Sequence, residues 1–180
     1  MRQPLFGNAM NAIYWAEEAA QRPDIDSQLT KFHVKGGSGD MTPDEIRDVA
    51  LTITGIVTNY EKPKGLAFTA VYGHPNIFLV MSLGDMIAEQ LSVMEEAKNK
   101  QFASLRGLVC GVIESEYRRW HFGRNLSQAG LASKAGMTRQ SFAKSGWPEL
   151  QIAARQILHD WLEQAERGIT DQLGDRGWLS

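Results

Sequence analysis

Apolar residues recur every three to four positions along most of the chain, a pattern typical of amphipathic helices. The repeat predicts helices over residues 8–21, 42–57, 77–98 and 102–122, and another that starts at Pro148. The stretch 66–72 (LAFTAVY) fits a short helix or a strand, because so short an apolar run has no diagnostic period. We therefore expect a mostly α protein, a helical bundle containing a helix-turn-helix in its C-terminal half.

Helix boundaries and buried faces follow from local residue patterns. Thr42-Pro43-Asp44-Glu45 predicts a capped helix start with a capping box. Pro23 is expected to end the first helix, and residues 23–41, which contain GGSGD near their end, to form a connector. The tryptophans Trp15, Trp120 and Trp161 are most readily explained as core residues. The predicted buried stripes are Ala9, Ile13, Ala16 and Ala20 in the first helix, and Ile152, Ala153, Ile157, Leu158, Trp161 and Leu162 in the last.

The stretch 128–146 (QAGLASKAGMTRQSFAKSG) has the pattern of a helix-turn-helix. A first short helix would bury Leu131 and place the small Ala132 where the two helices touch. Gly136 would make the turn, because glycine tolerates a positive φ. Thr138 would cap the second helix, and Phe142 would face back onto the first, with Trp147 adding a contact.

The second helix would expose side chains that can reach DNA bases and phosphates, namely Thr138, Arg139, Gln140, Ser141 and Lys144. Residues 118–144 contain six Lys or Arg and no Asp or Glu, although the whole chain has a formal charge of −2. A local basic stretch in an acidic protein is typical of nucleic-acid binding. The alternative is an ordinary hairpin of two helices with a solvated basic face.

The sequence contains no recognisable catalytic or metal-binding motif. Histidines are scattered and no C-x-x-C is present, so we expect no metal, no cofactor and no enzymatic activity. Cys110 lies in an apolar run and is expected to be a buried, reduced thiol. Glu95-Glu96 and the pair Glu114 and Glu116 are expected on solvated helix faces, and the alternative is that such an acidic pair contacts a basic partner. No apolar run is long enough to span a bilayer, so we expect a soluble cytoplasmic protein. Binding to DNA would place it at the nucleoid.

The segment VIESEYRRWHFGRNLSQAGLASKAGMTRQSF and the following LQIAARQILHDWLEQA resemble the C-terminal half of phage Q-type transcription antiterminators. The resemblance covers about residues 105–165, and the N-terminal AIYWAEEAA is similar to the first helix of some Q proteins. The length and the N-terminal region look more like prophage or host relatives, such as AlpA-type bacterial antiterminators. Ser145-Gly146-Trp147-Pro148 departs from the phage pattern, which affects the end of the second helix.

This resemblance implies a protein that binds double-stranded DNA near a promoter and loads onto paused RNA polymerase that still carries its σ factor. It would then act at the RNA exit channel, near the nascent RNA, so that terminators are read through. By position, the five side chains of the second helix would contact bases and phosphates, and Arg124, Gln128 and Lys134 would contact the DNA backbone. Residues 1–100 would form an N-terminal helical region that contacts polymerase, 101–170 the DNA-binding region, and 171–180 a tail.

Two other functions fit the same residues. A conventional promoter-binding activator or repressor would use the same motif and act by occupancy or recruitment, usually as a dimer on a palindromic site. A protein-only interaction module, such as an anti-activator or antitoxin, would use the same helices against a protein target.

Overall fold

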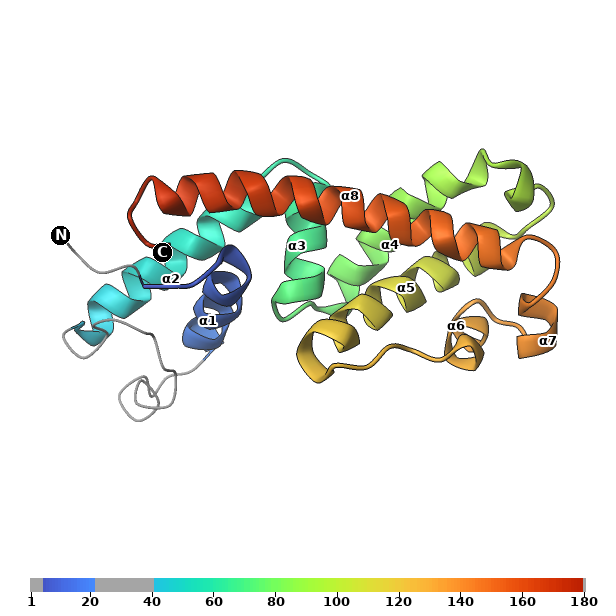
Figure 1. The fold of residues 1–180 in the computed structure, drawn as a ribbon, viewed down its shortest axis with the longest axis horizontal. Coiled ribbons are helices and arrows are strands. Elements are labelled where there is room, and N and C mark those ends of the chain that lie inside the picture. Colours follow the sequence, from blue (N-terminus) through green and yellow to red (C-terminus); the bar gives the residue numbers. More distant parts are fainter. Residues whose placement is uncertain (1–4, 22–40, 180) are drawn as a thin grey trace. The chain divides into compact units, whose positions relative to one another are not determined.

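The protein is mostly helical. The computed structural model describes residues 5–21 and 41–179; 75% of these are in helices and none lies in a strand. An isolated bridge pairs Phe6 with Leu179. The helices, drawn in Figure 1, are α1 (Ala9–Gln21), α2 (Pro43–Asn59), α3 (Lys64–Tyr72), α4 (Ile77–Ser92), the 3-10 turn η3 (Glu95–Ala97), α5 (Phe102–Phe122), α6 (Gln128–Lys134), α7 (Arg139–Phe142) and α8 (Trp147–Gly174).

Most predicted helix starts are confirmed. Thr42 accepts from the backbone N–H of Glu45 and the Glu45 side chain returns to the backbone of Thr42, so the capping box is present. The ambiguous stretch 66–72 lies in α3 and is helical. Pro148 lies in the first turn of α8, as expected. The stop at Pro23 and nearly all of the connector at 23–41 lie outside the described residues.

The predicted helix over 77–98 is too long, because α4 ends at Ser92. The Ser92 hydroxyl donates to the carbonyl oxygen of Glu89, 2.7 Å away, within its own last turn. The next turn would have placed Glu95 and Glu96 at the negative end of the helix dipole, which is unfavourable. These residues instead form η3.

The described chain packs into two compact units. Unit 1 contains the residues up to His74 together with those from Glu163 onward, and unit 2 contains Pro75–Leu162. The sequence-based segments 1–100, 101–170 and 171–180 divide the chain by expected role rather than by packing, and they stay predictions. No helix among the described residues is both long enough and apolar enough to cross a membrane.

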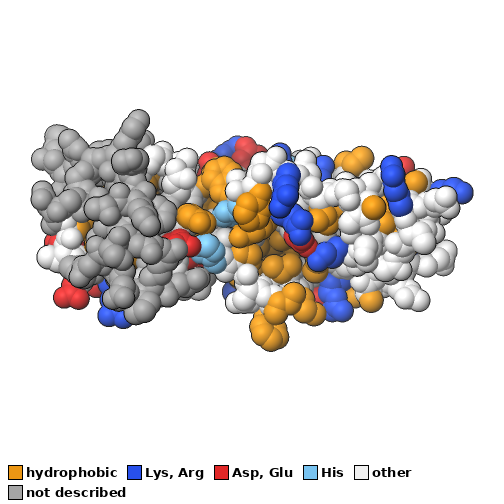
Figure 2. Space-filling model, turned by 90° about the horizontal axis from the view of Figure 1, so that it is seen from below, with side chains coloured by type: hydrophobic (Ala, Val, Ile, Leu, Met, Phe, Trp, Pro, Cys, Tyr) orange, Lys and Arg blue, Asp and Glu red, His pale blue; other side chains and the backbone are white. Residues whose placement is uncertain are grey.

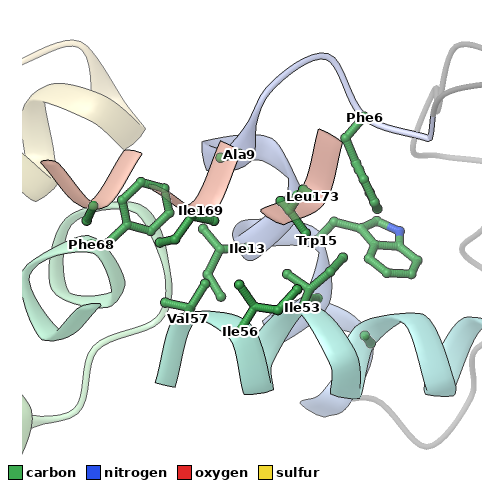
Figure 3. Packing of buried hydrophobic residues seen from close by; sticks show 14 of the residues in the cluster. Phe6, Ala9, Ile13, Trp15, Ile53, Ile56, Val57, Phe68, Ile169 and Leu173 are labelled. Carbon is green, nitrogen blue, oxygen red and sulfur yellow. The ribbon is translucent and has the colours of Figure 1, made fainter. Parts of the chain in front are cut away.

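The core of unit 1 forms where α1, α2, α3 and the end of α8 meet. Figure 3 shows Ile13, Ile53 and Ile169 directed into a common apolar space. Ala20, predicted in the buried stripe of α1, is exposed, because α1 is covered only as far as Ala16 and its neighbours. The predicted tail also packs here: the backbone oxygen of Trp178 accepts from the backbone N–H groups of residues 5 and 6 at 3.0 and 2.9 Å.

Unit 2 is built on an antiparallel hairpin of α4 and α5. Cys110 of α5 lies against α4, and Arg106, one turn earlier, reaches Asp85, which lies further along α4. A Cβ at Gly84 would lie 2.8 Å from the Cys110 sulfur, so glycine lets the two helices approach closely. Cys110 is a free, partly buried thiol, and this burial raises its pKa.

The buried face of α8 differs from the predicted stripe. Leu158 and Leu162 are buried as expected, but Ile152 is 69% exposed, and Ala153, Ile157 and Trp161 are partly buried. The face against the hairpin is set by Leu150 and Ala154, which precede Leu158 at four-residue intervals. Ile152 is two positions from Leu150 and therefore points away from this face.

Truncation of the unit 1 core tests this packing. We expect Ile53→Ala to lower the free energy of unfolding by about 2–5 kcal/mol, because Ile53 is fully buried. Leu51→Ala is the matched control on the same helix: Leu51 is 59% exposed, and its truncation should change stability by less than about 0.5 kcal/mol. Urea denaturation followed by circular dichroism measures both, and equal losses would show that α2 packs through a different face.

Candidate nucleic-acid interface

Two short helices, α6 and α7, are both capped by hydroxyl side chains. Ser127 accepts from the backbone N–H of Gly130 at 3.1 Å, and Thr138 accepts from that of Ser141 at 3.2 Å. Between the helices, Gly136 has a φ of 76°, as the predicted turn requires. The predicted cap at Thr138 and the turn at Gly136 are therefore confirmed.

The inner faces of α6 and α7 are apolar. Ala132 is 1% exposed and Phe142 is fully buried, as predicted. The Phe142 ring stacks on the Trp147 ring with their centroids 6.2 Å apart, so Trp147 provides the expected extra contact. The Lys100 ammonium lies 5.0 Å from the centre of the Trp147 ring and donates a hydrogen bond to the carbonyl oxygen of Ser145.

The second helix is shorter than a typical recognition helix. α7 contains four residues and ends at Phe142. Ser145 and Gly146 then adopt left-handed conformations with φ of 61° and 76°, which turns the chain toward α8. A Cβ at Gly146 would lie 2.9 Å from the Cβ of Glu96, so this turn packs closely on η3. Lys144 therefore lies beyond α7 and not on its exposed face.

Glycines on α5 allow α6 to pack against it at very short distance. A Cβ at Gly107 would lie 2.1 Å from the carbonyl oxygen of Lys134, and one at Gly111 would lie 3.1 Å from the Leu131 side chain. The loop before α6 is bound as well, because the backbone N–H of Leu126 donates to the buried Ser115 hydroxyl at 3.1 Å. The sequence analysis missed this role of the pair Gly107 and Gly111, although their four-residue spacing places both on one face of a helix.

The eight side chains predicted to contact DNA are all exposed around α6 and α7. Arg139 and Gln128 lie together, with the Arg139 Nε atom 3.5 Å from the Gln128 side-chain oxygen. The Thr138 and Ser141 hydroxyls are hydrogen bonded at 3.0 Å. The exposed set is Arg124, Gln128, Lys134, Thr138, Arg139, Gln140, Ser141 and Lys144.

The cations of residues 118–144 fall into two classes. Arg118 and Lys134 both pair with Glu114 at 2.6 Å, and Arg119 pairs with Glu116 at 2.7 Å. Within the part of the chain that the structure describes, the other three cations, Arg124, Arg139 and Lys144, form no ion pair with a carboxylate. On the face seen in Figure 2, some Lys and Arg side chains lie near one another beside hydrophobic side chains, and others are isolated. The positive charge available to an anion is therefore greatest at these three residues.

The expectation that Glu114 and Glu116 are solvated is wrong. Glu116 is 2% exposed and lies within 3.1 Å of the Arg155 Nε atom and 3.2 Å of the His159 Nε2 atom of α8. Glu116 follows Val112 by four positions and Val109 by seven, so the spacing of the apolar stripe already placed it on the buried face. Its carboxylate links α5 to α8.

Glu114 lies at the contact between α5 and α6. Partial burial acts to raise the pKa of its carboxyl, but the hydrogen bond and charge of Lys134, with the charge of Arg118, lower it overall. The carboxylate is therefore ionised well into the acidic range, and it binds the last residue of α6 to α5.

The end of α5 exposes aromatic side chains. Trp120, expected in the core, is 42% exposed, because α5 extends beyond its buried stretch over the last turn. His121 packs against Tyr117 with ring centroids 4.1 Å apart. Gly123, with a φ of 65°, ends the helix.

Compared with known proteins, the chain matches no family model, no curated protein and no solved structure. Among the described residues, no group of three or more His, Cys, Asp or Glu side chains is placed to bind a metal ion. The interface is therefore defined by its own geometry: two capped short helices, a glycine contact with α5, and three exposed cations.

A methyl group added at the glycine contact should separate α6 from α5. We expect Gly107→Ala to lower the free energy of unfolding by about 1–3 kcal/mol, because the new Cβ meets a backbone oxygen that cannot move away by rotation. Gly55→Ala, in the interior of α2 with no atom within 4 Å of the new Cβ, should instead raise stability by up to about 1 kcal/mol. Thermal denaturation of both variants measures this, and a Gly107→Ala variant as stable as wild type would contradict the close contact.

The Glu114 ion pairs should make the attachment of α6 sensitive to acid. Because the pKa of Glu114 is lowered in the folded state, its stabilising contribution is complete above the ordinary value of 4.5 and is lost as the pH falls through the folded-state value. Glu114→Gln should therefore weaken the protection of α6 amides from exchange at neutral pH. When the pH is lowered, these amides should lose less additional protection in the variant than in the wild-type protein. Hydrogen exchange at several pH values measures this effect. Glu89→Gln, on the exposed face of α4, should leave the wild-type profile unchanged.

Proposed function

We propose that this protein is a transcription antitermination factor that binds a DNA element near a promoter through α6 and α7, acting as a short helix-turn-helix. The observation that carries the DNA-binding part is the start of α7. Arg139 and Gln140 follow the cap Thr138 directly and are exposed, in a stretch without acidic residues. The first residues of a recognition helix are those that reach base edges in the major groove.

The roles of the cations follow from their ion pairs. Arg139 is free of carboxylates among the described residues and can approach a guanine edge, while Gln140 suits adenine. Lys144 and Arg124, which flank the two helices, suit phosphates. Lys134 must exchange its bond with Glu114 for one with a phosphate, so its contribution to DNA affinity should be smaller than that of an unpaired lysine.

The antitermination part of the proposal rests on the resemblance of residues 105–165 to Q-type antiterminators. The order of helices is the one that this resemblance implies: α5 is followed by the short helices α6 and α7, and then by the long helix α8. In this proposal the N-terminal residues contact RNA polymerase, and the protein acts at the RNA exit channel near the nascent RNA. The one-turn length of α7 favours a protein that obtains part of its affinity from polymerase, because so few residues can enter the groove.

Two alternatives share the same residues. A conventional activator or repressor requires only the DNA contacts, and it is separated from the proposal by termination assays. A protein-only interaction module predicts no DNA binding, whereas contacts to phosphates predict an affinity that falls steeply with salt concentration.

Substitutions within the interface test its DNA contacts. Arg139→Ala should cost about 1–3 kcal/mol at the cognate site and relax the base preference at one position. Lys144→Ala should weaken binding to all sequences about equally and reduce the slope of the salt dependence by about one. Fluorescence anisotropy with cognate and base-substituted duplexes measures both, and identical profiles for the two variants would contradict these roles.

Termination assays test the proposed mechanism. In a purified system of polymerase, σ factor, template and this protein, we expect read-through of an intrinsic terminator when the template carries the protein's site near the promoter. Occupancy of DNA cannot by itself change the outcome at a distant terminator, so the protein must travel with polymerase. The fraction of transcripts that extend beyond the terminator is the measurement.

Two controls make this assay specific. Moving the site away from the promoter should abolish read-through, because loading requires the paused complex. Adding excess competitor DNA after elongation begins should leave read-through unchanged. Increased initiation with unchanged termination would exclude antitermination and favour a conventional activator.

A further inference from the structure

The last two turns of α5 carry a group of ring side chains that the proposed DNA contacts do not use. We call this group the aromatic end of α5; it consists of Tyr117, Trp120, His121 and Phe122. Phe122 is 61% exposed and Trp120 is 42% exposed. Figure 2 shows hydrophobic side chains at the surface beside Lys and Arg on the face that carries this turn. Large exposed aromatic groups of this kind mark binding surfaces.

The rings are ordered relative to one another. The Tyr117 ring lies 4.1 Å from that of His121 and meets that of Phe122 edge-on, with centroids 6.1 Å apart. The guanidinium of Arg124 lies 5.9 Å from the Phe122 centroid, over the ring. The contacts with Tyr117 and Arg124 hold Phe122 in place, while 61% of its surface remains exposed.

The charges around these rings are positive. Arg118 and Arg119 belong to the same two turns, and Arg119 keeps 57% of its side chain exposed beside its bond to Glu116. No Asp or Glu occurs in the chain between Glu116 and Glu149. A ligand that complements this surface must offer negative charge together with flat, stackable groups.

We propose that the aromatic end of α5 binds a single-stranded nucleic acid. Unpaired bases stack on Phe122 and Trp120, and Arg124 and Arg119 contact the phosphates. The bases of a duplex already stack on one another and do not offer their faces, so this surface distinguishes single strands from the duplex bound by α6 and α7. A hydrophobic protein partner would cover the rings but would offer no negative charge to Arg124, which forms no ion pair among the described residues. The inference goes beyond the proposed function, because it concerns a single-stranded ligand and ring side chains that the duplex contacts do not use. Arg124 is the side chain that both interfaces would share.

Binding of labelled oligouridine and oligothymidine of equal length, measured by anisotropy, tests this inference on the full chain. Phe122→Ala and Trp120→Ala should each weaken binding by about 5- to 150-fold, the range for losing one stacked base. Phe102→Ala is the matched control: Phe102 is also 42% exposed and lies on α5, about 30 Å away at the other end of the helix. Arg124→Ala should reduce the salt dependence by about 0.7 in slope, the value for one phosphate of a single strand. Circular dichroism checks that each variant is folded.

Each outcome supports or overturns the proposal. The proposal is supported if Phe122→Ala weakens binding of single strands and leaves binding of the duplex site unchanged. If Arg139→Ala weakens binding of the duplex site and leaves binding of single strands unchanged, the two sites are independent, and this inference can be judged separately from the proposed function. Stronger binding of oligouridine than of oligothymidine identifies RNA as the ligand, and the reverse preference identifies DNA. Absence of binding by the wild-type protein, or an equal loss with Phe102→Ala, overturns it. The proposal is also overturned if Phe122→Ala reduces association with polymerase and leaves oligonucleotide binding unchanged. That result would show that the rings bind a protein partner.

Discussion

The close approach of α6 to α5 is the constraint on which the candidate interface depends. Helices of seven and four residues are too short to be stable in water, because the cost of helix nucleation is not recovered. α6 and α7 therefore form only while they are packed on the rest of unit 2. That packing requires glycine at position 107, where any side chain would overlap the carbonyl oxygen of Lys134. The shape of the candidate interface thus depends on a residue of α5 that is covered by α6 and would not itself contact a ligand.

Two glutamates of α5 organise the charge of unit 2. Glu116 is buried and links α5 to Arg155 and His159 of α8, whereas Glu114 is partly exposed and links α5 to α6. The buried carboxylate is tolerated because Arg119 and Arg155 both compensate its charge, and removal of either would leave that charge only partly compensated. The same pairs reduce the positive charge of Arg118, Arg119 and Lys134, so Arg124, Arg139 and Lys144 determine where an anion is attracted most strongly.

Local patterns in the sequence predicted helices, caps and turns well, and tertiary contacts explain where they did not. Thr42, Thr138 and Gly136 act within a few residues of chain, so their roles could be recognised from the sequence. The close packing of the turn after α7 on Glu96 and the pairing of the buried Glu116 with Arg155 both involve residues distant in the chain. Ile152 was misassigned because hydrophobicity was given more weight than the four-residue register set by Leu150. The DNA-contacting roles of the exposed side chains stay predictions.

The dependence of two short helices on their support has a thermodynamic consequence for any ligand they bind. Local opening that releases α6 from α5 destroys the binding surface, so a ligand selects the docked form and suppresses the opening. At a concentration of one hundred times the dissociation constant, the docked form gains about 2.7 kcal/mol. Amides in α5 and α6 that exchange through this opening would then be protected roughly a hundredfold, although several of them lie under the interface rather than in it. A ligand bound at the surface of unit 2 would in this way stabilise residues in its interior without any change in the average structure.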